Sequence, residues 1–203
     1  ARDTFSMLYQ HGLPMQPKAF AVGVRIEHPQ EMINQDQYGK NYPSFLPAAP
    51  YKLTANLDNG RGVYTFCMCP GGYVVNASSE EHRLAVNGMS YSRRDSQNAN
   101  TAVIVTVSPD DFGSDHPLAG VEFQRKLEEA AYLEGNGKVP VQLFGDFCEN
   151  RPSVQLGTVT PHIKGMYQLA NVRNIFPEFI AESLTEGIKI FDHKLPGYAR
   201  CDA

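Results

Sequence analysis

The sequence predicts an α+β fold, with a mixed, largely antiparallel sheet flanked by two or three helices. Segments with strand-like patterns are concentrated in the first half of the chain, whereas the long segments with helical periodicity lie in the second half. Asp58-Asn59-Gly60 separates two of the strand-like segments, as a hairpin turn does. The chain has 203 residues, which favours one domain or one domain with a lobe, and 42% of them are hydrophobic, which is enough for a packed core.

Local patterns define the elements of the first half. Phe5, Leu8 and Tyr9 share one face of a short helix over 2–12, and Gly12 is a natural end for it. The apolar run over 19–26 predicts a buried strand, whereas the three prolines of residues 41–50 predict a loop. The other predicted elements are a helix over 31–38, strands over 51–57, 62–68, 72–76 and 83–87, and a turn at Asn87-Gly88.

The second half begins with the clearest strand, over 101–107, whose nearly continuous apolar run predicts burial on both faces. Pro117 is expected to open a helix that ends at Gly135. Strand character returns over 139–147, and residues 148–175 are predicted to be irregular. Pro177 opens the last helix, and its predicted buried stripe is Ile180, Leu184, Ile188 and Phe191.

Charge and composition exclude several classes of function. The net charge of −4 argues against a nucleic-acid surface, because phosphate binding needs clustered Lys and Arg. The sequence has no apolar run of membrane-spanning length and no signal peptide, so no membrane partner is predicted. Four cysteines do not form a disulfide framework for a chain this large. The expected location is therefore the cytoplasm.

The two ends suggest a piece of a longer protein. The chain opens at Ala1 without a starting Met and enters a helix at once, and it closes at Ala203 in the middle of a segment. A tag scar or proteolysis is the alternative explanation.

The segment Cys67-Met68-Cys69-Pro70-Gly71-Gly72 carries the strongest local signal. In an extended strand, Cys67 and Cys69 fall on the same face, so both thiols could point at one ligand. Gly71 and Gly72 remove side chains and would allow a close approach of backbone to a cofactor or substrate. The alternatives are two small buried hydrophobes and a plain tight turn. No His lies at ligand spacing from the pair, so no metal site is predicted.

Polar residues supply further candidates. The stretch from Asn87 to Asn100 includes Ser90 and Arg94, and it leads as a polar loop into the clearest strand, where binding residues tend to lie. It could equally be a solvated surface loop. Arg25 is a charge inside an apolar strand and needs a partner. Glu27 lies on the same face and could supply that partner, or Arg25 could face an anionic ligand.

The sequence contains no complete catalytic motif. The six histidines have no recognisable triad partners, and neither a Gly-x-Gly-x-x-Gly nor a P-loop pattern is present. The chain is therefore not expected to hold a dinucleotide by a complete site of its own.

Several phrases together resemble bacterial FAD-dependent dehydrogenases of unassigned substrate. They are Ala1-Arg2-Asp3-Thr4-Phe5, the run over 21–29, the run over 64–72, Ala85-Val86-Asn87-Gly88-Met89-Ser90, Phe144-Gly145-Asp146-Phe147 and Gly197-Tyr198-Ala199-Arg200. In that family a Rossmann-type FAD domain precedes this region, and a later segment returns to it. The resemblance thus implies that residues 1–203 are one inserted, substrate-side (cap) domain of a larger flavoprotein oxidoreductase, with both ends close in space.

The resemblance also implies roles for individual residues in the full-length protein. FAD would be bound there and not by this chain alone, which would be inactive by itself. Arg2, Asp3, Gly71 and Gly72 would lie on the cofactor side, and Cys67 and Cys69 could tune the flavin or relay reducing equivalents. Arg25, Asn87, Ser90 and Arg94 would contact an unknown small-molecule substrate. The flavin-binding domain of the same polypeptide would be the partner. A non-catalytic module for a ligand or protein, and a purely structural insertion, are the competing functions.

Overall fold

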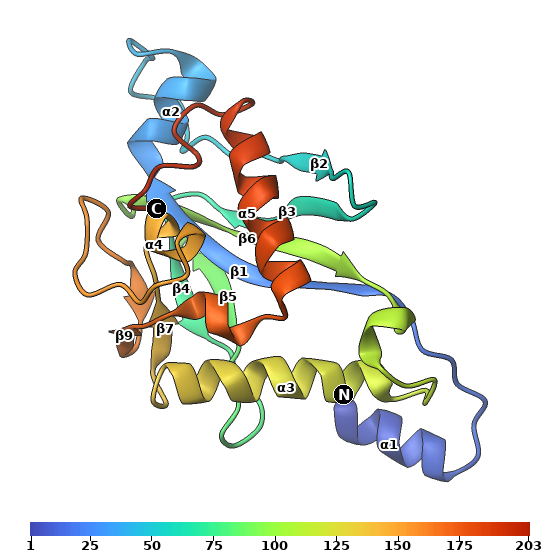
Figure 1. Ribbon diagram of the computed structural model, residues 1–203. Helices are drawn as coiled ribbons and strands as arrows, with labels where there is room; N and C mark the ends of the chain where they lie inside the picture. Colours follow the sequence, from blue (N-terminus) through green and yellow to red (C-terminus); the bar gives the residue numbers. More distant parts are fainter.

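The computed structural model describes all residues 1–203 and confirms the α+β class. Its main sheet is antiparallel and has the strand order β1-β6-β3-β2 (Figure 1). These strands are β1 (Phe20–Pro29), β2 (Thr54–Asn56), β3 (Gly62–Cys69) and β6 (Asn98–Val107). Strands β2 and β3 form the hairpin that Asp58-Asn59-Gly60 predicts, and β1 ends the sheet on the opposite side.

One face of the main sheet is buried beneath helix α5 (Glu178–Asp192), which crosses it as the red helix in Figure 1. Paired residues of antiparallel strands share a face, so Val63, Val103 and Val105 line this side together. The stripe predicted for α5 is confirmed, because Ile180, Leu184, Ile188 and Phe191 are almost completely buried. Gly187 allows the helix to approach closely, since a Cβ there would lie 2.5 Å from the Val63 side chain.

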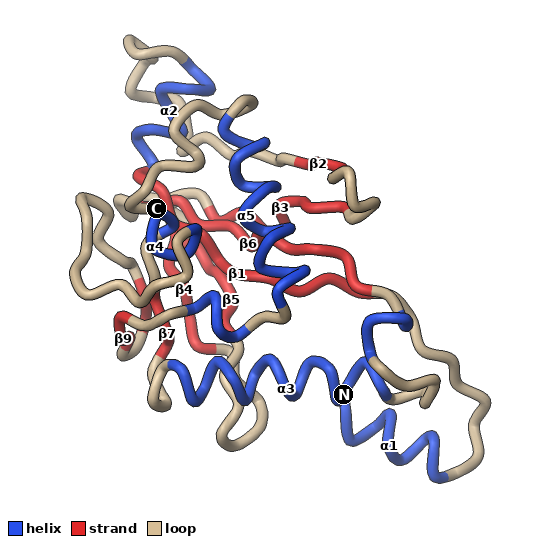
Figure 2. The backbone as a smooth tube through the Cα atoms, viewed as in Figure 1, coloured by secondary structure: helices blue, strands red, loops and turns tan.

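Two smaller sheets and the other helices complete the domain (Figure 2). One sheet joins β4 (Gly72–Asn76) to β5 (Val86–Ser90) and, in parallel, to β8 (Ile163–Lys164). The other pairs β7 (Val139–Val141) with β9 (Tyr167–Leu169), also in parallel. The remaining elements are α1 (Arg2–Gln10), α2 (Gln30–Tyr38), α3 (Ala119–Glu134), α4 (Phe144–Cys148) and the 3₁₀ turns Pro109–Phe112 and Val172–Ile175.

Four local expectations are wrong, and the first is that residues 148–175 are irregular, because β8, β9 and a 3₁₀ turn lie in that segment. Asn87-Gly88 is not a turn, because both residues lie inside β5 and pair with β4. Residues 144–148 form helix α4 in place of the second half of a strand, and the N–H of Phe144 donates to the carbonyl of Ala203. The sequence predicts that strand β6 is buried on both faces over 101–107. Buried and half-buried residues alternate there, so one face is fully buried and the other is not.

The two ends of the chain lie apart in Figure 1 rather than side by side. The N-terminal helix α1 lies beside α3, whereas the C-terminus lies next to α4. The expectation of adjacent ends is therefore not met.

Stability should fall as the pH drops below 6.5, because His28 is buried without charge. The imidazole on β1 is fully buried, its Nε2 lies 2.7 Å from the Tyr198 carbonyl oxygen, and burial lowers its pKa to about 4. The unfolded chain binds this proton near pH 6.5, so the contribution of neutral His28 is present above that pH and is lost as the pH falls toward 4. We expect the domain to be about 2 kcal/mol less stable at pH 5 than at pH 8.

Exchange of the slowest amides of β6 measures this loss. A His28→Asn variant is the control, because it removes the titrating group. An equal loss between pH 8 and pH 5 in that variant would assign the effect to other groups.

Candidate functional site

Arg25 gathers several predicted site residues around one guanidinium group on β1. Its Nε donates to Asn100 Oδ1 at 2.8 Å, and its Nη1 donates to Asn87 Oδ1 at 3.3 Å. Its Nη2 donates to the carbonyl of Cys67 at 2.5 Å and lies 3.6 Å from Cys69 Sγ. We call Arg25, Cys67, Cys69, Asn87 and Asn100 the Arg25 cluster. Because every guanidinium nitrogen is used inside the chain, the cluster fixes β1, β3, β5 and β6 relative to one another.

Glu27 does not pair with Arg25, so that expectation is wrong. The two carboxylate oxygens of Glu27 each accept from the backbone N–H of His162 at 3.1 Å, and one also accepts from Asn98 Nδ2. Burial raises the pKa of this carboxyl group, against the lowering effect of those hydrogen bonds. Glu27 thus ties β1 to the segment before β8.

A β-bulge separates the two cysteines of β3. The register with β6 shifts between Phe66 and Cys69, and Cys67 has a positive φ of 49°. As a result Cys67 is exposed whereas Cys69 is buried, and the expectation that both thiols share one face is wrong. Burial raises the pKa of Cys69, and its thiol donates to the Cys67 carbonyl at 3.4 Å. Cys69 is therefore held as a neutral thiol. Of the two cysteines, only Cys67 faces solvent, and it does so next to the exposed ring of Phe66.

Gly71 and Gly72 are buried against the chain itself. A Cβ on Gly71 would lie 1.9 Å from the carbonyl oxygen of Arg94, and one on Gly72 would lie 2.6 Å from that of Met89. The N–H of Gly71 donates to Gln30 Oε1 at 2.7 Å. The absent side chains are therefore needed for internal packing, and a cofactor-side role is not required to explain them.

The structure also locates the other residues of the predicted polar loop. Ser90 donates its hydroxyl hydrogen to the Pro70 carbonyl at 2.7 Å, beside the two glycines. Arg94 is exposed in the shorter loop of residues 91–97, which connects β5 to β6. Asn87, Ser90 and Arg94 thus surround the segment 67–72, and their contact with a substrate remains a prediction.

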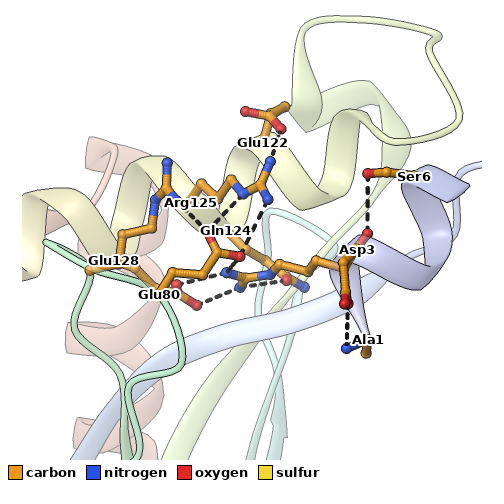
Figure 3. Close-up of polar contacts among 10 residues, drawn as sticks. Ala1, Asp3, Ser6, Glu80, Glu122, Gln124, Arg125 and Glu128 are labelled. Carbon is orange, nitrogen blue, oxygen red and sulfur yellow. Dashed lines mark hydrogen bonds and ion pairs between the residues drawn. The ribbon is translucent and has the colours of Figure 1, made fainter.

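Arg2 and Asp3 are the first residues of α1 and contact none of the residues of the Arg25 cluster. Figure 3 shows Asp3 beside Ala1, with Glu80 and Glu128 nearby. The guanidinium group of Arg2 forms two hydrogen bonds with Glu128, at 2.8 and 2.5 Å, and an ion pair with Glu80 at 3.3 Å. Arg125 also forms an ion pair with Glu80, so a network of two arginines and two glutamates joins α1, α3 and the loop after β4. Asp3 is exposed and accepts from the N-terminal amino group of Ala1. The cofactor role of Arg2 and Asp3 remains a prediction.

The predicted stretch from Asn87 to Asn100 contains Ser96, Asn98 and Asn100 without singling them out, and the sequence patterns missed His162 altogether. Asn100 is fully buried in the Arg25 cluster, and Ser96 Oγ lies 2.5 Å from His162 Nδ1. The His162 ring also stacks on Tyr73, at 5.7 Å between ring centroids. No local signal identifies these partners, because the pairing of β4 with β8 brings residue 162 to this place.

An apolar groove of about 380 Å³ runs along the free edge of β1. It is lined by 34 residues, 25 of them hydrophobic, including the seven consecutive residues 21–27 of β1 and the five consecutive residues 139–143. Leu127 and Ala131 of α3 and Phe144 and Phe147 of α4 also line it. Arg25 and Glu27 are among its polar residues, so the groove adjoins the Arg25 cluster.

The structure defines an α+β domain in which the partly buried Arg25 cluster and an apolar groove adjoin on one strand. None of its helices is both long and apolar enough to cross a bilayer, and no three His, Cys, Asp or Glu side chains are grouped to hold a metal ion.

The chain belongs to the family described as FAD-dependent protein, C-terminal domain-like, whose pattern matches residues 19–203. It is also similar to an uncharacterized protein of Clostridium beijerinckii, with 53% identity over 208 residues. That match covers 100% of this chain and 39% of the relative, so the chain spans well under half the length of that protein.

Proposed function

We propose that this chain is the substrate-side domain of an FAD-dependent oxidoreductase, and that it covers the flavin and shapes the substrate site there. Membership in the family supports a link to FAD, and the greater length of the relative supports a separate cofactor-holding part. When bound, a flavin supplies hydride or electron transfer. The observation that carries the proposal is the exposed bulge at Phe66 and Cys67, which Arg25 holds by a hydrogen bond to the Cys67 carbonyl.

The residues present fit a covering role. Phe66 exposes 63% of its surface, next to the exposed thiol of Cys67, and a flat aromatic ring and a small thiol suit contact with a planar ring system. Arg25 binds the Cys67 carbonyl, so the bulge is fixed before any partner arrives. In this role Phe66 and Cys67 exclude water from the covered group, and the nearby loop of residues 91–97 contributes Arg94 as a cationic contact for a substrate.

Replacing Cys67 by serine in the full-length protein tests this function. We expect Cys67→Ser to change the flavin absorbance spectrum and to alter the rate of flavin reduction by roughly tenfold, because a group in contact with the ring tunes and positions it. The measurements are the visible spectrum and stopped-flow reduction with a donor that reduces the unmodified protein.

Two matched variants complete the experiment. Cys201→Ser removes another exposed thiol, outside the Arg25 cluster, and should leave both readouts unchanged. Cys69→Ser replaces the buried neutral thiol and should affect the bulge more than the flavin. An unaltered spectrum together with unaltered kinetics in Cys67→Ser would exclude a ring contact.

A further inference from the structure

The edge of β1 faces the apolar groove and has no strand partner. Strand β1 pairs only with β6, and outside that ladder no backbone hydrogen bond involves residues 20–29. Seven consecutive residues, 21–27, line the groove, so side chains from both faces of the strand flank it. The unpaired N–H and C=O groups of the strand therefore point into a largely hydrophobic space.

The opposite wall repeats this arrangement. Strand β7 has β9 as its single neighbour, and residues 139–143 line the groove continuously. Helices α3 and α4 supply further apolar lining through Leu127 and Phe147. The groove thus lies between two strand edges and is bordered by helices, which is the environment of an interior strand of a sheet.

We propose that an extended apolar segment from the rest of the longer polypeptide fills this groove and pairs with the free edge of β1. The occupant is backbone rather than a hydrocarbon ligand, because only backbone can satisfy the N–H and C=O groups of β1 that its burial would otherwise leave unpaired. A seven-residue strand spans about 24 Å, so residues 21–27 provide a complete strand's length of pairing.

The origin of the segment follows from the family relationship. The related protein is matched over only 39% of its length, so most of such a polypeptide lies outside these residues. Asp202 and Ala203 are themselves part of the groove lining, which places the end of this chain beside the proposed strand. The inference rests on the chain being part of a longer protein, and it is independent of whether Cys67 contacts a flavin.

Hydrogen exchange of the full-length protein, analysed by mass spectrometry, gives the first test. In an edge strand, the alternate amides that point away from β6 exchange rapidly. If the groove is filled, we expect those amides of residues 20–29 to exchange roughly 100-fold more slowly than the amides of a free edge strand. Their rates should then be similar to those of the β6 amides. Peptides from residues 14–19, whose backbone N–H groups donate to no partner within the chain, serve as the unprotected control.

Photo-crosslinking then identifies the occupant. A benzophenone side chain is introduced in the full-length protein as Val141→p-benzoylphenylalanine, in the groove, and as Val154→p-benzoylphenylalanine, which replaces an 86% exposed side chain outside it. We expect the probe at 141 to label residues outside 1–203 of the same polypeptide, and the probe at 154 not to label that segment.

Three results would overturn the inference. They are rapid exchange of alternate β1 amides, cross-links from 141 only to residues within 1–203, and cross-links between isotopically light and heavy copies, which would indicate a second molecule. The exchange experiment uses the unmodified protein. It therefore decides whether the groove is filled even if a cross-linking variant fails to fold. If the groove is filled but Cys67→Ser leaves the flavin spectrum and the reduction rate unchanged, this inference stands and the flavin-covering role is rejected.

Discussion

Replacing Gly71 by alanine is expected to destabilise the domain by about 4 kcal/mol, a large effect for a single added methyl group. The added Cβ would lie 1.9 Å from the carbonyl oxygen of Arg94 and 2.2 Å from its carbon, so backbone must move. A positive φ of 47° adds strain, because L side chains rarely adopt it. The shift would also disturb the hydrogen bond from the Gly71 N–H to Gln30.

Gly60→Ala is the matched control. Gly60 also has a positive φ, of 81°, but a Cβ added there would have no other atom within 4 Å. Conformational strain alone then predicts a loss of only about 1 kcal/mol. The slowest amides of β6 report both effects, and Gly71→Ala should accelerate their exchange about 1000-fold. Equal effects of the two variants would show that the contact with Arg94 is unimportant.

Replacing Arg25 by methionine is expected to cost about 3 kcal/mol and to release the bulge at Cys67. Methionine retains much of the side-chain length but has no donors. The buried Oδ1 of Asn100 would then lose its partner, and the carbonyl of Cys67 would retain only the weak hydrogen bond from the Cys69 thiol. Arg25→Lys keeps the charge but not the planar fork, and we expect it to recover less than half of the loss.

Thiol labelling of Cys69 measures this change. Cys69 is buried in the intact cluster, and loss of Arg25 should increase its labelling rate about 100-fold, as followed by mass spectrometry. Arg93→Ala is the control, because Arg93 is exposed and forms no hydrogen bond or ion pair, and it should leave the rate unchanged. If Cys69 remains unreactive in Arg25→Met, the cluster is not what keeps the thiol buried.

The elements with strong local patterns are predictable from the sequence. The stripe of α5 and the hairpin at 58–60 depend on spacing and turn residues within one segment, and both are confirmed. Helix α4 is not predictable in this way because its partners are distant, with Phe144 and Gly145 donating to Ala203 and Cys201. Local propensity contains no information about such a contact.

The site shows the same division between local and long-range information. Local patterns identify segment 67–72 and Arg25 as candidates, and the fold does bring them together. Gly88 resembles a turn residue because nothing nearby in sequence indicates its real constraint. A Cβ at Gly88 would lie 2.3 Å from Arg25 Nη2 and 2.4 Å from Asn100 Oδ1, and both residues belong to other strands.

Helix α1 is attached to the domain in an unusual way, because none of its residues is buried. Arg2 joins it to Glu128 and Glu80 through partly exposed charges. Mobile ions screen such attraction over a length that falls from about 8 Å at physiological ionic strength to about 3 Å in 1 M salt, which is comparable to the 3.3 Å between Arg2 and Glu80, whereas packing of the apolar interior does not depend on this attraction. The attachment of α1 to the domain therefore depends on ionic strength. Concentrated salt would release this helix while the rest of the domain stays folded.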